Sequence, residues 1–187
     1  LPFILSTAAY NLSASLNNKL YTSIMIYAKN VEETLVYNDY GIFSEAMKVS
    51  NIPIAFASAM AAAIIPTIAQ LVAKKDLKSS KKKIHQAVKT IMIVSIPSAV
   101  GLGVLAKPVI QLLFPTEAGL EVAGYTLMAL AISVVFYALS TLSSSILQGI
   151  GKVNAPIINA VLALLIQTAT LVPLLFFTEW NVYALAI

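Results

Sequence analysis

Charged residues gather in a few short segments of this chain, and the stretches between them are almost entirely apolar. These stretches are long enough for a helix to cross the hydrocarbon core of a bilayer, which takes about 20 residues. They lack the strict alternation of apolar and polar positions that transmembrane β-strands require. The pattern predicts an all-α, polytopic helical membrane protein with spans at approximately residues 2–28, 42–73, 84–106, 122–148 and 156–178, and the start of a sixth span at residue 182.

The composition also indicates a membrane protein. Of the 187 residues, 59% are hydrophobic and 11% are charged, and the mean hydropathy is +0.86. A soluble globular domain has about 25% charged residues. The chain begins at Leu1 rather than Met, and an apolar segment follows without the charged start of a signal peptide. We therefore expect residues 1–187 to form a single membrane domain that is a fragment of a longer protein.

The twelve cationic residues are all lysines, and their distribution predicts how the helices are oriented. If successive spans alternate in direction, most lysines fall on one side of the membrane. That side carries Lys74, Lys75, Lys78, Lys81, Lys82, Lys83, Lys89 and Lys152, with Asp76 as its acidic residue. Cytoplasmic segments carry an excess of Lys and Arg, so the segment 74–83 is predicted to be a cytoplasmic loop. We expect it to contact anionic lipid headgroups and not nucleic acid, because it lacks Arg and interleaved aromatic residues.

The sequence has no arrangement of residues that is typical of catalysis or metal binding. The single histidine, His85, lies in the basic segment and is expected at the membrane interface. No pair of carboxylates stands at helical spacing within a span, and the absence of cysteine excludes disulfides and thiolate metal sites. We therefore predict no enzymatic activity, no metal site and no cofactor.

Polar side chains recur inside three of the predicted spans at spacings that a 3.6-residue period places on one face. These stripes are Thr7, Asn11, Ser15, Asn18 and Thr22 in the first span, Ser133, Tyr137, Ser140, Thr141, Ser144 and Gln148 in the fourth, and Asn159, Gln167 and Thr170 in the fifth. Two interpretations remain open. Hydrogen bonds between helices are the simpler one and contribute about 0.6 kcal/mol each. Polar faces on three spans would also line a water-filled cavity.

Two lysines lie within or close to the spans. Lys19 interrupts the first span, and Lys48 comes just before the uncharged part of the second, with Glu45 three residues earlier on the same face. A lysine at the centre of a bilayer costs about 2.5–3.5 kcal/mol on insertion scales, so a partner or ligand is expected for it. The alternative is snorkelling toward the interface, which we favour for Lys19, whereas both interpretations stay open for Lys48. A cation that faces a cavity would suit an anionic substrate such as a diphosphate.

Three stretches resemble a known transporter family. They are "NIPIAFASAMAAAIIPTIAQLVAKKD" (51–76), "SIPSAVGLGVLAKPVIQLLFP" (95–115) and "FYALSTLSSSILQGIGKVNAPIINA" (136–160). Their prolines, glycines and basic residues are similar in order to those of the polysaccharide transporter and lipid II flippase family. This is the MurJ, Wzx and SpoVB-like branch of the multidrug/oligosaccharidyl-lipid/polysaccharide exporter superfamily. The resemblance covers nearly the whole chain.

The resemblance implies a two-lobe, alternating-access transporter of the bacterial plasma membrane, of which this chain is most of the second six-helix lobe. Its substrate would be an undecaprenyl-diphosphate-linked saccharide, carried from the inner to the outer leaflet. A coupling ion is a further partner that such a transporter could use. The family has a cationic residue in its cavity near the start of the second helix of this lobe. Lys48 lies in that neighbourhood, as Lys rather than Arg.

Two other functions are alternatives to this one. A cation-coupled multidrug exporter of the related branch would favour acidic residues inside the spans, and Glu45 is the one acid close to a span core. A non-transporting membrane scaffold would not need the polar stripes. We therefore expect a flippase or exporter, with a cavity lined by candidates among Lys48, Lys19, Glu45, Asn11, Ser15, Asn18, Tyr137, Ser144, Asn159 and Gln167.

Overall fold

The computed structural model describes residue 12 and residues 15–114, 119–178 and 181–186. This part of the chain is helical and contains no strand, which confirms the predicted all-α membrane fold. A helix over residues 15–23 continues into a π-helix, η1 (Ile24–Ala28). The elements that follow are α2 (Glu33–Ala73), α3 (Leu77–Val104), α4 (Ala106–Leu113), α5 (Leu120–Gly149), α6 (Ala155–Phe177) and the 3-10 helix η2 (Asn181–Ala186).

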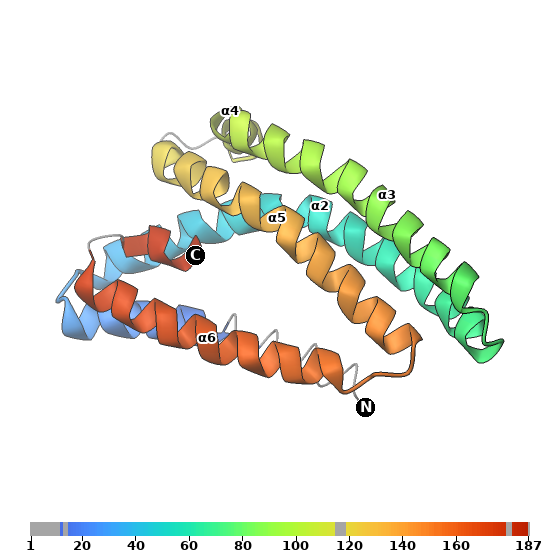
Figure 1. Cartoon of the computed structure of the whole chain (residues 1–187). Helices are drawn as coiled ribbons and strands as arrows, with labels where there is room; N and C mark the ends of the chain where they lie inside the picture. Colours follow the sequence, from blue (N-terminus) through green and yellow to red (C-terminus); the bar gives the residue numbers. More distant parts are fainter. Residues whose placement is uncertain (1–11, 13–14, 115–118, 179–180, 187) are drawn as a thin grey trace.

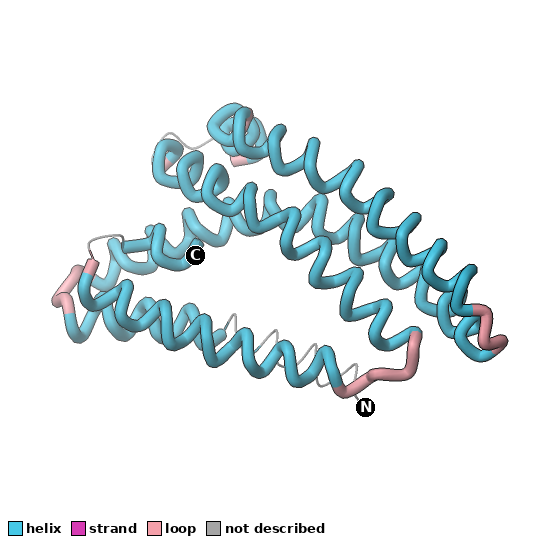
Figure 2. The backbone as a smooth tube through the Cα atoms, in the orientation of Figure 1, coloured by secondary structure: helices cyan, strands magenta, loops and turns pink. Residues whose placement is uncertain are grey.

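The helices form two arms that converge at one end of the molecule (Figure 1). One arm contains α5 packed against α2 and α3, and the other contains α6 beside the first helix. The Lys29 Nζ atom donates a hydrogen bond of 2.7 Å to the carbonyl of Thr178 and holds the first helix against the end of α6. Figure 2 shows that the turn between α2 and α3 and the loop between α5 and α6 lie at the same end of the molecule. The two segments that carry most of the lysines therefore share one end.

Four helices within the described residues are long and apolar enough to cross a membrane, namely α2, α3, α5 and α6. Each overlaps one of the predicted spans, but two of them start earlier than expected. Helix α2 begins at Glu33 rather than near residue 42, and α3 begins at Leu77 rather than near residue 84. Residues 2–11 and 13–14 of the predicted first span lie outside the described residues. The predicted start of a sixth span coincides with η2.

The segment 74–83 is not a loop, as the run of lysines suggested, but a short turn followed by the first turns of α3. The helix can begin here because the Asp76 side chain accepts a hydrogen bond of 3.0 Å from the Ser79 N–H, which satisfies a free donor at the helix start. This bond from the Ser79 backbone lowers the pKa of Asp76. Most of the lysines in the segment therefore have positions fixed by a helix.

The third predicted span also ends differently. The chain leaves helical geometry at Leu105, and α4 begins as a separate helix at Ala106. Pro108 has no N–H to donate to the carbonyl of Val104, so one hydrogen bond that would join the two helices cannot form. By contrast, Pro53, Pro66 and Pro97 remain inside helices, which membrane helices tolerate.

Small residues allow α2, α3 and α5 to pack closely. One cluster of buried residues joins Ala57 and Ala61 of α2, Ala87 of α3 and Ala138 of α5 around Ile91 and Leu142. Helices in lipid associate mainly through such close approach of small side chains. Ala57 and Ala61 thus make one side of the alanine-rich stretch of α2 a packing face. Ala55, Ala59 and Ala62 lie on its exposed side.

Thr126 is a polar residue for which the packing offers no partner. Its side chain is 0% exposed on α5, and its hydroxyl has no hydrogen-bond partner in the described part of the chain. A buried hydroxyl without a partner costs about 1–3 kcal/mol, and its replacement by an apolar group of the same shape removes that cost. We expect Thr126→Val to raise the melting temperature of the purified full-length protein. Thr168→Val is the control, because the Thr168 hydroxyl donates to the Leu164 carbonyl at 2.9 Å. A lower melting temperature for Thr126→Val would contradict this expectation.

Candidate functional site

Lys48 lies on the exposed side of α2, away from the helices that α2 packs against. Asn51, Ala55 and Ala59 are also exposed and follow Lys48 at spacings that a helix places on one side. Ala55 and Ala59 are single methyl groups, whereas Ile52 and Phe56 on the same part of α2 are 63% and 52% exposed. The ammonium group therefore lies on a side of α2 that no described helix covers, beside both small and bulky apolar side chains.

Glu45, one turn before Lys48, is half-buried and does not form an ion pair with it. Lys48 has no hydrogen-bond or ion-pair partner among the residues described. A lysine close to an apolar span is costly without compensation. The charge of Lys48 is therefore available to an anion from outside this part of the fold.

In the first helix, Ser15 and Lys19 are exposed and Asn18 is half-buried, whereas Asn11 lies outside the described residues. The Thr22 hydroxyl donates to the carbonyl of Asn18 at 2.9 Å, inside its own helix. The role of Lys19 stays a prediction.

The stripe on α5 lies at the border between the buried and the exposed sides of the helix. Tyr137 is 37% exposed, and Ser144 is half-buried. The hydroxyl of Ser133 donates to the Leu130 carbonyl at 2.6 Å. Hydroxyl groups in several helices, such as those of Ser58 and Thr168, are likewise bonded to carbonyls of their own helix. These bonds satisfy the hydroxyls locally, so such residues do not need a partner on a neighbouring helix.

The third stripe meets the first helix at a small cavity. Asn159 is exposed, and Gln167 and Thr170 of α6 line a cavity of about 10 Å³ together with Asn17 of the first helix. This is close to the smallest volume that holds one water molecule. The structure therefore brings polar residues of the first and fifth predicted spans together, but through Asn17 rather than the predicted Asn18.

A charged cluster at the end of the molecule opposite the 74–83 segment was not predicted. The Lys107 Nζ atom of α4 lies 2.9 Å from Glu121 Oε1 and 4.7 Å from the centre of the Tyr125 ring. The hydrogen bond to Glu121 raises the pKa of Lys107. The side chain of Lys107 crosses directly over Gly124, where an added Cβ would meet the Lys107 Cγ atom at 2.5 Å. The one sign of this cluster in the sequence was the four-residue spacing of Glu121 and Tyr125, which places both on one face of α5. The cluster ties α4 to α5.

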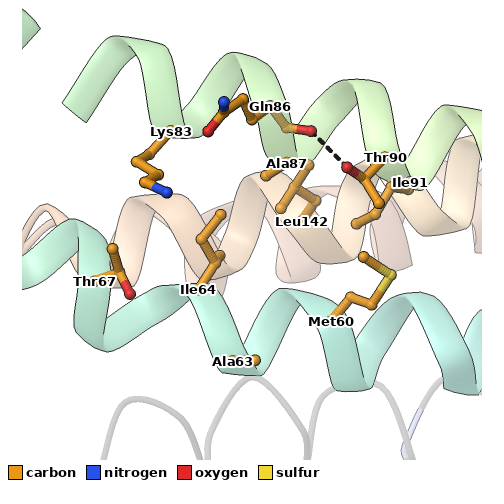
Figure 3. Close-up of a pocket in the computed structure, with 10 residues that line it drawn as sticks. All are labelled: Met60, Ala63, Ile64, Thr67, Lys83, Gln86, Ala87, Thr90, Ile91 and Leu142. Carbon is orange, nitrogen blue, oxygen red and sulfur yellow. Dashed lines mark hydrogen bonds between the residues drawn. The ribbon is translucent and has the colours of Figure 1, made fainter. Parts of the chain in front are cut away.

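The larger of the two cavities described lies between α2 and α3, with a volume of about 300 Å³. Its wall includes Lys83, Gln86 and Thr90 of α3 (Figure 3). Gln86 and Thr90 were not singled out from the sequence, whereas Lys83 belongs to the segment 74–83 that was predicted to contact anionic headgroups. Neither cavity includes Lys48 or Lys19 in its wall.

Comparison with known proteins identifies the family. Residues 22–187 match the sequence profile of the family described as lipid II flippase MurJ. The lipid II flippase MurJ of Bacillus subtilis (strain 168) is 28% identical over 129 residues, which are 68% of this chain and 24% of that protein. An uncharacterized membrane protein of the same strain, YabM, is 28% identical over 118 residues, which are 63% of this chain and 21% of that protein.

The chain thus spans about a quarter of the length of these curated relatives. No solved structure matches it. The profile match extends from the end of the first helix through η2 and confirms the resemblance seen in the sequence. With four helices that are able to cross a membrane and a match over most of its residues, the chain belongs to the lipid II flippase MurJ family.

Proposed function

We propose that the full-length protein moves an undecaprenyl-diphosphate-linked saccharide from the inner to the outer leaflet of the bacterial plasma membrane by alternating access. The saccharide is lipid II or a polysaccharide repeat unit, and the residues of this chain form most of the second lobe. The observation that carries the proposal is the match of residues 22–187 to the MurJ family. The protein acts as a transporter and not as an enzyme.

Lys48 supplies the chemistry that such a substrate requires. A diphosphate carries negative charge and several acceptor oxygens, and an ammonium group binds it through charge-assisted hydrogen bonds. Lys48 is exposed and has no partner among the described residues, and no described helix covers its side of α2. We assign Lys48 as the residue of this lobe that contacts the diphosphate. Glu45, Tyr137 and Ser144 are proposed to border the same cavity, with Asn159 and Gln167 on α6.

Complementation tests the proposed function directly. The full-length gene is expressed in a Bacillus strain depleted of its own lipid II flippases. We expect it to restore growth and to make lipid II accessible to an externally added degrading enzyme. If growth returns only for polysaccharide export mutants, the substrate is a different lipid-linked saccharide. A protein that restores neither process but lowers the accumulation of cationic drugs would contradict the proposal.

The proposed orientation places the turn between α2 and α3 in the cytoplasm, because this end carries most of the lysines. The described chain contains no cysteine, so single cysteines can be introduced at opposite ends of α2 and α3. In the full-length protein without other cysteines, we expect Ser79→Cys to be protected from an impermeant maleimide in intact cells. Glu33→Cys, at the other end of α2, should be labelled. The reverse labelling pattern would invert the proposed topology.

A further inference from the structure

The cavity between α2 and α3 lies near the lysine-rich end of the molecule and has walls of mixed polarity. Thr67 of α2 and Lys83 and Gln86 of α3 line one part of it. In Figure 3 the Lys83 ammonium group extends from α3 into the space above Ile64 and Thr67 of α2, and the amide oxygen of Gln86 lies on the side that faces Lys83. Polar side chains of two helices therefore line one end of the cavity.

These side chains are free to bind a ligand. Lys83 has no ion pair, and the hydroxyl of Thr67 has no hydrogen-bond partner, among the interactions of the described residues. Both side chains are exposed. The ammonium group of Lys83 suits the oxygens of a phosphodiester, and the exposed Gln86 amide and Thr67 hydroxyl can each donate a hydrogen bond after rotation of the side chain.

The other part of the cavity is apolar. Ile91 and Leu142, each 1% exposed, belong to the buried cluster at its floor, and Met60 lines the same part. From Lys83 to Ile91, α3 rises by roughly 12 Å. The cavity thus changes from cationic to apolar along the direction that leads from the lysine-rich end into the span. This is the order of polarity in a phospholipid, from its headgroup to its acyl chain.

The charges on α3 add to this complementarity. Lys78, Lys81, Lys82 and Lys83 all lie in the first two turns of α3. The N-terminus of a helix already carries a partial positive charge, so cations there are unfavourable and anions are favourable. Asp76 is the one acidic residue at this helix start. An additional anion beside Lys83 would relieve the repulsion.

The cavity is separate from the proposed substrate site. Thr67 lies 19 residues after Lys48 on α2, which corresponds to roughly 28 Å along the helix axis and roughly 100° around it. The cavity therefore faces α3, whereas Lys48 lies on a side of α2 that no described helix covers.

From these observations we infer that the cavity between α2 and α3 is a binding site for an anionic glycerophospholipid such as phosphatidylglycerol. The phosphodiester binds to Lys83, Gln86 and Thr67, and an acyl chain lies along Met60, Ile64 and Ile91. The lipid comes from the leaflet at the lysine-rich end. Its binding does not depend on the proposed flipping activity.

Native mass spectrometry of the full-length protein tests this site. The protein is released from vesicles that contain equal amounts of phosphatidylglycerol and phosphatidylcholine, and the retained lipids are counted. We expect retention of phosphatidylglycerol over phosphatidylcholine, and a loss of at least about tenfold for Lys83→Gln, since this variant loses a charge-assisted hydrogen bond to the phosphodiester. Lys82→Gln is the matched control, because it removes the same charge one position earlier, outside the cavity wall. This control should retain the lipid.

A second variant distinguishes lipid binding in the cavity from attraction of the lipid by the surface charge. Ala63→Trp fills the cavity from α2 without changing any charge, and it should abolish retention of phosphatidylglycerol. Complementation by all three variants should be normal, which distinguishes a failure of this inference from a failure of the proposed function. Equal losses for Lys82→Gln and Lys83→Gln, or full retention by Ala63→Trp, would overturn the inference. Displacement of the lipid by inorganic phosphate alone would also overturn it, because the acyl chain would then contribute nothing.

Discussion

Replacement of Lys48 by alanine in the full-length protein is expected to abolish movement of the lipid-linked saccharide while expression stays normal. Lys48 is exposed on α2 and has no partner within the described structure, so its charge is free to bind the diphosphate. A hydrogen bond to a charged group contributes about 1.5–3 kcal/mol, which corresponds to about a tenfold to hundredfold change in affinity. Substrate binding should therefore fall by this factor, and flipping should fall with it.

A leaflet-protection assay measures this effect, because lipid II in the outer leaflet is degraded by an added enzyme and lipid II in the inner leaflet is protected. Lys48→Arg keeps the positive charge and should retain most of the activity. Lys152→Ala removes another exposed lysine, in the loop between α5 and α6, and should be fully active. The snorkelling alternative predicts normal flipping by Lys48→Ala, so full protection-assay activity of that variant would exclude Lys48 from the substrate site.

The order of the four long helices α2, α3, α5 and α6 could be predicted because hydropathy reports which stretches can lie in lipid. The helix ends could not be predicted in this way. Helix α2 starts at Glu33 and α3 at Leu77, in both cases among charged residues. A helix is free to continue past the hydrocarbon core into water, where its charged residues cost little. The Asp76 side chain that starts α3 is a local signal, but the run of lysines around it indicated a solvated loop.

The candidate site was predictable only in part, because helical spacing identifies a face without saying what the face meets. Asn17 and Asn18 point about 100° apart on the first helix. The first helix packs against α6 in such a way that Asn17, and not Asn18, lines the small cavity. For the same reason Lys83 could not be distinguished from Lys82 in the sequence. Only the position of α2 beside α3 reveals which of the two lysines lines the cavity.

Gly149 at the end of α5 is the position where a substitution should most disturb the packing of the helices. A Cβ atom there would lie 3.3 Å from the Ile65 carbonyl oxygen and 3.3 Å from the Ile68 Cβ atom, both on α2. Ile68 is completely buried, so it has little room to move. We expect Gly149→Leu to force α5 away from α2 and to destabilise the full-length protein by about 1–3 kcal/mol, the usual cost of overpacking.

The gain in helix propensity on replacing glycine is only about 0.5–1 kcal/mol. The cost of overpacking should therefore exceed this gain, so Gly149→Leu should be less stable than the wild type. The matched control is Gly41→Leu on α2, where an added Cβ meets no atom within 4 Å and the same gain in propensity applies. Thermal denaturation in detergent, followed by the fraction that still elutes as a monodisperse peak, measures both variants. Gly149→Leu should melt below the wild type and Gly41→Leu at or above it. Equal melting temperatures for the two variants would mean that α5 can tilt away from α2 at little cost, and that the close approach at Gly149 does not hold this end of the bundle together.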